Sequence, residues 1–250
     1  MTTSVASVED LNEVLENGGN IRLEENITST EEPITIDENT TAAIELNNNT
    51  IVATTVNNGN LTISNGTIDI DAAGLENNGT ATITNVTMNA GYTKPDNTGG
   101  SYANISNAGS ETTYNDVEII SANGGVGAQG GAKVIFNSGK VVVDSTNTAA
   151  RYNFCAFDEG TEIIINGGEF SFSPTKNQRR AYIYAAPGTT VYVNGGTFGP
   201  ASARSGYTAG ILGEGTIIIK GGTFGFDPSE WVADGYEAVK DGEVWTVSAK

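Results

Sequence analysis

The chain has 250 residues, of which 38% are hydrophobic and 17% charged, and 32 are glycine. Its formal net charge of −18 argues against a nucleic-acid partner, because phosphate binding requires a basic surface. It contains no histidine, which removes His-based nucleophilic triads and the commonest metal ligand. No apolar run approaches the length of a membrane span, so we expect no membrane insertion.

The negative charge is concentrated in the first half of the chain. Residues 1–130 hold 18 acidic and 2 basic residues, a net charge of −16. Residues 131–250 hold 12 acidic and 10 basic residues, a net charge of −2. The two ends are therefore expected to face different electrostatic tasks, or one end simply tolerates more charge repulsion.

Residues 1–20 are predicted to form an N-terminal arm and a capping helix. Ser7 is the expected N-cap, with Asp10 three residues later, and Gly18-Gly19 end the helix. The apolar stripe between them consists of Val8, Leu11, Val14 and Leu15. Ile21-Arg22-Leu23 then alternate as the first strand. The opening residues lack the basic and apolar regions of a secretion signal, so none is expected.

An eight-residue unit recurs along the chain without gaps, separated by spacers of irregular length. The eight copies are Ile44–Ile51, Leu61–Ile68, Ala81–Met88, Thr112–Ile119, Val134–Val141, Ile163–Phe170, Val191–Phe198 and Ile217–Phe224. We expect insertions to fall between units and never inside them, since the unit is a packed layer and the spacer a surface loop.

The unit alternates like a strand at its first three positions and returns to an apolar residue at its eighth. Asn-Gly-Gly at positions four to six predicts a bend with positive φ. The clearest bend residues are Asn166, Gly167, Gly168, Asn194, Gly195, Gly196, Gly221 and Gly222. If equivalent positions stack, an apolar column becomes aromatic toward the C-terminus. An asparagine column then runs beside it, comprising Asn47, Asn115, Asn137, Asn166 and Asn194.

These units predict one all-β parallel solenoid over residues 21–226. A β-propeller would need longer repeats, and a leucine-rich repeat would need a Leu-rich strand. Residues 227–250 are predicted to form a C-terminal capping hairpin around Lys240-Asp241-Gly242. Trp231 and Trp245 are interpreted as capping side chains, with ligand stacking as the alternative. Cys155, the single cysteine, is predicted to be a small buried residue.

Two stretches resemble known families. The helix, Gly-Gly, strand and Leu46-Asn47-Asn48-Asn49-Thr50-Ile51 resemble the N-terminal cap and first turns of pectate-lyase-like β-helix proteins. The Asn-Gly-Gly-Thr-Phe repeats and the ending at residues 227–236 resemble surface and phage structural proteins of gut bacteria. The resemblance implies a single right-handed parallel β-helix. It implies little about activity, because this fold serves lyases, hydrolases, adhesins and phage fibres.

Acidic pairs do not point to a specific reaction. Asp69 and Asp71 lie on one strand face without a basic residue nearby in the chain, and are interpreted as a solvated acidic edge. Facing carboxylates of a glycosidase could come from Asp144, Asp158 and Glu159, or from Glu162 and Glu169, but any acidic solenoid offers such pairs. We therefore expect no enzyme activity, no cofactor and no metal.

Arginine and tyrosine residues cluster in the second half, in segments expected to be loops between the repeats. The cluster comprises Arg151, Tyr152, Lys176, Arg179, Arg180, Tyr182, Tyr184, Arg204 and Tyr207. Arg151 and Arg180 each fall 17 residues after the start of their unit, which predicts that they stack on one face. Charge combined with ring stacking suits an acidic sugar or a protein partner. The alternative is a stabilising stripe among acidic neighbours.

The favoured function is a non-enzymatic virion structural protein of a bacteriophage: a head fibre, capsid decoration or tail-fibre module. The expected partners are two further copies in a homotrimer, other virion proteins and host-surface glycan, and the expected location is the particle surface. Two alternatives remain: a β-helix carbohydrate-active enzyme, either polysaccharide lyase or glycoside hydrolase, and an adhesin on the bacterial cell surface.

Overall fold

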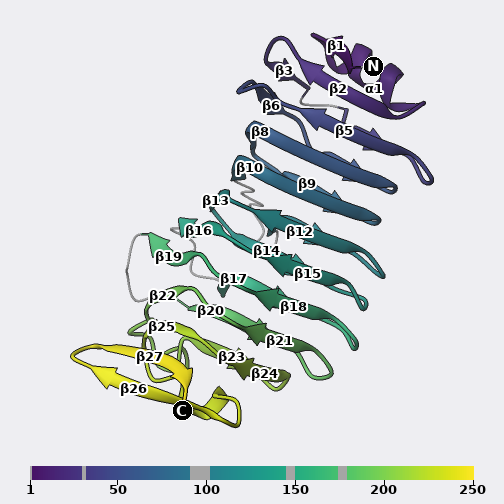
Figure 1. Ribbon diagram of the computed structural model, residues 1–250. Helices are drawn as coiled ribbons and strands as arrows, with labels where there is room; N and C mark the ends of the chain where they lie inside the picture. Colours follow the sequence, from purple (N-terminus) through teal and green to yellow (C-terminus); the bar gives the residue numbers. More distant parts are fainter. Residues whose placement is uncertain (1, 30–31, 91–101, 145–149, 174–178) are drawn as a thin grey trace.

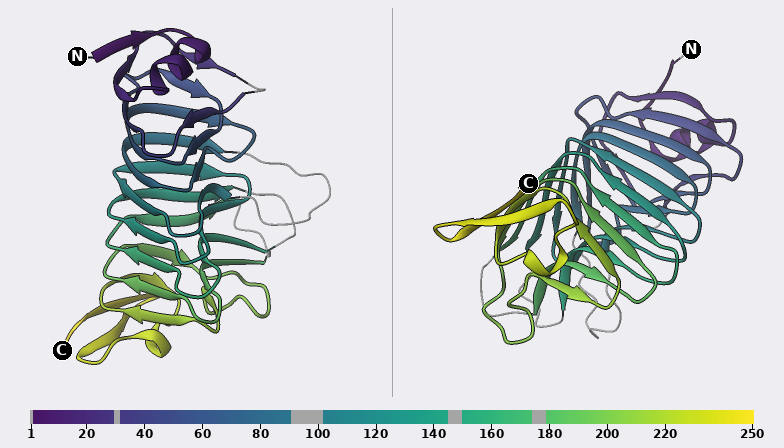
Figure 2. Two further views of the ribbon diagram at one scale, coloured as in Figure 1. Left: turned by 90° about the vertical axis from the view of Figure 1, so that its right-hand side faces the viewer. Right: turned by 60° about the horizontal axis from the view of Figure 1, so that its bottom comes forward.

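The protein is an all-β chain whose strands stack into two sheets along one long axis (Figure 1). The computed structural model describes residues 2–29, 32–90, 102–144, 150–173 and 179–250. In these residues one sheet has 19 strands and the other has 8. The N-terminal residues lie at one end of the stack and the C-terminal hairpin at the other (Figure 2).

The larger sheet contains two side-by-side columns of strands, joined where β8 (Asn60–Ile70) and β10 (Thr80–Ala90) run through both. The first column also contains β1 (Thr2–Val5), β2 (Gly19–Leu23), β5 (Thr41–Glu45), β12 (Glu111–Asn115), β15 (Lys133–Phe136), β18 (Glu162–Ile165), β21 (Thr190–Val193) and β24 (Thr216–Ile219). The second column contains β3 (Ile27–Thr28), β6 (Thr50–Val52), β13 (Val117–Ser121), β16 (Gly139–Asp144), β19 (Glu169–Ser173), β22 (Thr197–Pro200) and β25 (Gly222–Gly225).

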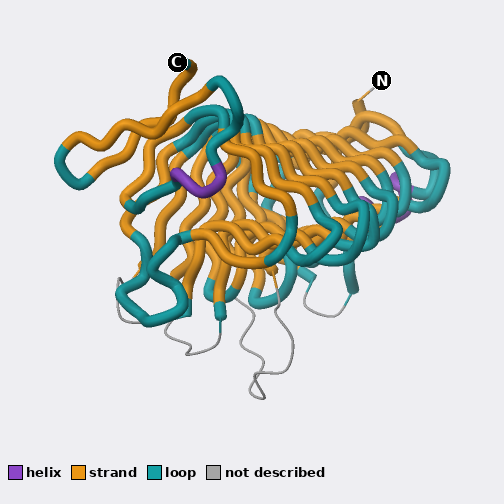
Figure 3. Tube along the Cα trace, turned by 90° about the horizontal axis from the view of Figure 1, so that it is seen from below, coloured by secondary structure: helices purple, strands orange, loops and turns teal. Residues whose placement is uncertain are grey.

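The smaller sheet is a third column, on the opposite side of the core. From its N-terminal end it contains β4 (Ile34–Ile36), β7 (Thr55–Asn57), β9 (Leu75–Asn77), β11 (Tyr102–Ser106), β14 (Gly124–Ala128), β17 (Arg151–Ala156), β20 (Arg180–Ala185) and β23 (Ile211–Gly213). Each turn of the chain crosses the three columns in the same order, for example β15, β16 and β17. Strands of each column pair in parallel with their equivalents in the next turn, and Figure 3 shows successive strands running side by side along the stack.

The observed register confirms the predicted repeat from Leu61 onward. First positions pair with first positions, as in Leu61 with Ala81 and Val134 with Ile163. Eighth positions pair likewise, as with Phe170 and Phe198. Spacers of different length therefore do not disturb the stacking of the units.

The first copy departs from the prediction. Ile44 pairs with Ile63 instead of Leu61, whereas Ile51 still pairs with Ile68. The unit here begins at Ala42 and carries two extra residues inside its bend. The expectation that insertions never fall inside a unit is therefore wrong at this position, because the surface bend accommodates the extra residues and the strands on either side keep their register.

Each bend contains a residue in the left-handed region, and its type changes along the stack. Asn65, Asn85 and Asp116 adopt φ of 59°, 53° and 50° at the fifth position. At the sixth position in later copies, Gly168 and Gly196 adopt 118° and 107°. Asparagine tolerates the first conformation, whereas only glycine adopts the second readily. The predicted positive φ is thus confirmed for the second glycine of each Asn-Gly-Gly.

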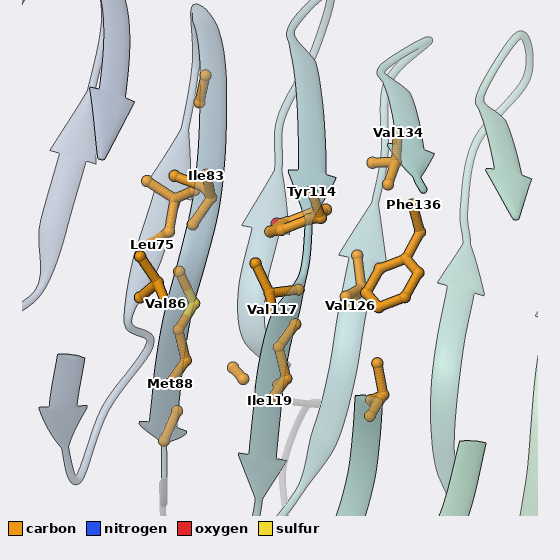
Figure 4. Close-up of a cluster of buried hydrophobic side chains, with 14 of the residues drawn as sticks. Leu75, Ile83, Val86, Met88, Tyr114, Val117, Ile119, Val126, Val134 and Phe136 are labelled. Carbon is orange, nitrogen blue, oxygen red and sulfur yellow. The ribbon is translucent and has the colours of Figure 1, made fainter. Parts of the chain in front are cut away.

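The core between the sheets is aliphatic at the N-terminal end and aromatic toward the C-terminus. Ile83 and Met88 give way to Tyr114 and Phe136 within the region drawn in Figure 4, and all four are fully buried. Cys155 is also fully buried, as predicted. Because every turn buries its own apolar residues, the hydrophobic stabilisation is spread along the whole axis.

The N-terminal end carries the predicted helix, α1 (Val8–Leu15). The Ser7 hydroxyl accepts a hydrogen bond from the Asp10 backbone N–H at 3.0 Å, and Gly18 follows the helix with a φ of 68°. The expectation that the first strand begins near Ile21 is wrong, because β1 precedes the helix and pairs in parallel with β2. An added strand satisfies backbone groups that would otherwise be left at the sheet edge.

The C-terminal end carries the predicted hairpin, formed by β26 (Tyr236–Asp241) and β27 (Val244–Ala249). β27 pairs antiparallel with β25 and so covers the last strand of the second column. A short 3-10 helix, Ser229–Trp231, precedes the hairpin. Trp231 and Trp245 are half-buried against the core, in agreement with their interpretation as capping side chains.

Candidate functional site

The structure places part of the arginine–tyrosine cluster in strands and not in loops. Arg151 pairs in register with Arg180 across β17 and β20, which confirms their predicted stacking. Both side chains are buried, with exposed fractions of 7% and 2%, and Tyr182 is buried beside them. Lys176 lies outside the described residues.

The remaining members of the cluster are more accessible. Arg179 is exposed, whereas Tyr152, Tyr184, Arg204 and Tyr207 are half-buried. The rings of Tyr152 and Tyr184 stack with centroids 5.0 Å apart and an interplanar angle of 30°. The cluster thus divides into a buried arginine pair and a partly exposed tyrosine stack on the same two strands.

The buried arginine pair places like charges on adjacent strands. Burial lowers the pKa of Arg180, Asp144 raises it, and Arg151 lowers it by charge repulsion. Burial also lowers the pKa of Arg151, and the Tyr102 and Tyr152 phenols act in the opposite direction. Among the described residues, the buried Nε of Arg151 has no hydrogen-bond partner, while its Nη1 donates to the Ala150 carbonyl at 2.9 Å. The two guanidiniums therefore lie in a region of low solvent access, with Asp144 as a counter-charge for Arg180.

A cleft of about 370 Å³ opens beside Arg180. It lies between β19, β20 and the segment after β22, which are neighbours in Figure 1. Its walls include Phe172, Arg180, Tyr182 and Pro200. The Arg180 guanidinium carbon lies 5.5 Å from the centre of the Phe172 ring, and the Tyr182 hydroxyl donates to the Pro200 carbonyl at 3.1 Å. These contacts hold a cation and two aromatic rings at the wall of a largely apolar cleft.

The acidic residues considered for catalysis do not form such a pocket. Asp69 and Asp71 are exposed. Glu162 lies 3.9 Å from the Lys133 ammonium, so its described ionic partner is a cation and not a second carboxylate. Asp158 and Glu159 lie in an exposed turn between β17 and β18. Within the described ranges, no group of three or more acidic or cysteine residues could hold a metal ion.

Asparagine side chains form ladders that follow the axis. Asn137, Asn166 and Asn194 each donate to the amide oxygen of the residue in the preceding turn, starting from Asn115, at 2.7–2.8 Å. The predicted column is confirmed for these four residues. Asn47 is not part of it: its amide donates to the Leu23 carbonyl, since it belongs to the longer first bend.

A second ladder of amide side chains was not predicted from the sequence. Asn78 donates to Asn58, Asn107 to Asn78 and Gln129 to Asn107, at 2.7–2.8 Å. These residues lie outside the eight-residue unit, in turns that lead from the smaller sheet to the next turn of the chain. The recurring Asn57-Asn58-Gly59 and Asn77-Asn78-Gly79 triplets are the signal that could have found it. Both ladders link successive turns of the stack by side-chain hydrogen bonds.

Comparisons with known protein families, characterised proteins and solved structures give no match to this chain. In the part of the chain that the structure describes, no helix has the length and apolar character needed to cross a membrane.

Proposed function

We propose that the chain is a right-handed parallel β-helix that serves as a non-enzymatic structural and attachment protein on the surface of a bacteriophage virion. It would act as a head fibre, capsid decoration or tail-fibre module. The assignment to a virion rests on the resemblance of the Asn-Gly-Gly-Thr-Phe repeats to phage structural and surface proteins. The structural role rests on the geometry.

The observation that carries the structural role is the in-register parallel pairing through successive turns, with α1 at one end and the β26–β27 hairpin at the other. Such a stack is stiff because each turn is hydrogen-bonded to both neighbours over three columns. Covered ends prevent further strands from adding to the column edges that they mask. A stiff rod of fixed length is suited to holding a binding surface away from its support.

The outer face of the first column supports association with further copies. Ile135, Ile164, Tyr192 and Ile218 pair in register and form a half-buried apolar stripe along four adjacent strands. Equivalent positions closer to the N-terminus are Thr62, Thr82 and Thr113. An apolar stripe that begins halfway along a rod favours side-by-side contact of the second halves, as in a homotrimer.

Native mass measurement tests this proposal. We expect a homotrimer for the parent chain and a monomer for Ile164→Glu, with the melting temperature of the separated chain little changed because the side chain lies on the outer face. Thr82→Glu is the matched control, since it adds the same charge to the same position of the repeat. A monomeric parent chain would exclude the fibre.

The enzyme alternative predicts a different result. Incubation of the protein with pectin, alginate and host capsular polysaccharide, with and without calcium, should release no reducing ends and no unsaturated products. Reproducible turnover that is abolished by Asp69→Asn together with Asp71→Asn would replace the structural role with a polysaccharide lyase or hydrolase. A cell-surface adhesin would bind host cells but would not copurify with virions.

A further inference from the structure

At the N-terminal end of the stack, the second column ends in an uncovered edge strand. β3 pairs in parallel with β6 on one side, and no strand of the described residues pairs with its other side. Every later strand of this column pairs on both sides, up to β25, which β27 covers. Within the described ranges, β3 is therefore the one strand of the column that lacks a second neighbour.

The other two columns are covered at this end. β1 pairs with β2 and so covers the first column. In the third column, the backbone N–H of Thr35 in β4 donates to the Asn12 side chain of α1, and the Asn12 amide donates to the Pro33 carbonyl, both at 3.5 Å. The chain turns from β1 directly into α1, and it places no strand beside β3 (Figure 1).

The free side of β3 presents the backbone groups of an open sheet edge. In a parallel pair, each residue directs its N–H and C=O to the same side, and successive residues alternate. The Ser29 N–H donates to the Val52 carbonyl at 2.8 Å, so the backbone groups of Ser29 and Ile27 face β6. The N–H and C=O of Thr28, between them, therefore point away from β6, where a further strand would pair with them.

A pocket of about 440 Å³ lies at this edge, between β3 and the segment that enters α1. This β3 pocket is lined by residues 6–9 and 26–29 and by Glu32. Val8 and Ile27 are buried, whereas Glu9 and Glu32 are exposed. A strand added in register would therefore direct alternate side chains toward the apolar core and outward toward the carboxylates.

The charge around the β3 pocket selects a cationic segment. Residues 1–40 contain 10 acidic residues and one basic residue, Arg22. None of the described residues that line the pocket is basic, and the Arg22 guanidinium donates to the Asn47 amide oxygen at 2.6 Å. Lysine or arginine side chains of an added strand would meet the carboxylates of Glu9 and Glu32, whereas an acidic strand would be repelled.

We propose that the β3 pocket binds an extended segment of a partner protein in which lysine or arginine alternates with apolar residues. The segment adds a strand beside β3 through the N–H and C=O of Thr28, and its cationic side chains pair with Glu9 and Glu32. This inference goes beyond the proposed function, because it assigns a protein contact to the N-terminal end of the isolated chain, whatever particle or cell carries it.

Binding of the pentapeptide Val-Lys-Val-Lys-Val, with a fluorophore at its N-terminus and an amide at its C-terminus, tests the proposal by anisotropy. We expect saturable binding, and the peptide with glutamate in place of lysine should not bind detectably. Only every second peptide N–H faces β3. Of two forms that are N-methylated at the valines or at the lysines, one should therefore bind at least about tenfold more weakly and the other within about twofold of the parent peptide. Equal binding of the two forms would mean that charge alone holds the peptide, and this result or no binding of the parent peptide would overturn the proposal.

Two variants locate the site. Thr28→Pro removes the outward N–H, which no bond with β6 uses, and should reduce affinity at least about tenfold. Glu9→Gln combined with Glu32→Gln should reduce affinity about threefold to tenfold, the size expected for two exposed ion pairs, and provides the second test if Thr28→Pro does not fold. Glu13→Gln combined with Glu16→Gln is the matched control: it removes the same charge from exposed side chains outside the pocket, and should leave affinity within about twofold.

Undiminished affinity in the Glu9 and Glu32 double variant, or an equal loss in the control, would overturn the assignment to the β3 pocket. The outcome is separate from the oligomeric state. A monomeric chain that binds the peptide would reject the fibre and keep the β3 pocket.

Discussion

Phe198 and Phe224 lie face to face, with ring centroids 4.8 Å apart and ring planes within 3° of each other. Phe170 continues this column at 4.7 Å from Phe198. The spacing equals that of neighbouring strands, about 4.8 Å, so the rings repeat with the backbone hydrogen bonds. The sheet register therefore sets the spacing of these rings, and Phe198 contacts a ring on either side.

Truncating Phe198, the middle ring of this column, should remove its contacts with both Phe170 and Phe224. We expect Phe198→Ala to lower the free energy of unfolding by about 3–5 kcal/mol, since it leaves a cavity between two rings, and Phe198→Leu to cost clearly less. Chemical denaturation measures both. Val239→Ala is the control, because this side chain is 52% exposed and should change stability by less than about 0.5 kcal/mol. Similar losses in all three variants would show that the column contributes nothing specific.

The second glycine of each Asn-Gly-Gly bend should resist substitution because its φ is positive. Gly168 has a φ of 118°, and a Cβ there would lie 2.9 Å from the Gly139 carbonyl oxygen. We expect Gly168→Val to destabilise the protein by about 1–3 kcal/mol through backbone strain. Gly74→Ala is the control: its Cβ would meet only ordinary contacts, the nearest at 3.4 Å. Unchanged melting of Gly168→Val would contradict the left-handed bend.

Substitution of Tyr114 should not lower stability, in contrast to the substitutions of Phe198 and Gly168. It is fully buried, pairs in register with Phe136, and its hydroxyl has no hydrogen-bond partner among the described residues. A buried hydroxyl without a partner costs about 1–3 kcal/mol. We therefore expect Tyr114→Phe to be neutral or to stabilise the protein by up to about 1 kcal/mol in thermal unfolding. A loss of more than about 1 kcal/mol would mean that the hydroxyl has a stabilising role.

The repeat could be predicted from the sequence because its signal is local. Alternation, the bend and the eighth-position residue lie within eight positions, so the register from Leu61 onward follows from aligning them. The first copy could not be aligned in this way. Its bend, Asn47-Asn48-Asn49, contains asparagine as the other bends do, and nothing in the residues marks the two that are extra. Only the pairing of Ile44 with Ile63 reveals them.

The candidate site was harder to predict, because the burial of a side chain depends on contacts between residues that are far apart in the sequence. The spacing of Arg151 and Arg180 correctly indicated that they stack, but their position in the spacers between units suggested exposed loops. The structure buries both, because in β17 and β20 every residue is buried except Tyr152 and Tyr184, whose rings stack. The cleft depends on contacts between β19, β20 and the segment after β22, which no spacing along the chain encodes.

Alkaline pH should destabilise the protein through its buried thiol. Burial raises the pKa of Cys155, and its hydrogen bond with Tyr102 opposes this only in part. The folded chain therefore keeps the proton at a pH where the unfolded chain, with a thiol pKa of about 8.5, releases it. A group whose pKa is raised on folding contributes its full stability below the unfolded pKa and loses it as pH rises toward the folded pKa. The loss is about 1.4 kcal/mol per pH unit, or about 2 kcal/mol between pH 8 and pH 10.

Comparison with Cys155→Ala isolates this contribution. Groups that do not interact with Cys155 contribute equally in both proteins, so their effects cancel when the pH dependence of unfolding is compared. We expect the parent chain to lose about 2 kcal/mol more than Cys155→Ala between pH 8 and pH 10, measured by urea denaturation at each pH. A thiol reagent should also label Cys155 only after unfolding, because the side chain is fully buried. Parallel pH profiles for the two proteins, or rapid labelling of the native chain, would show that the thiol is accessible and titrates normally.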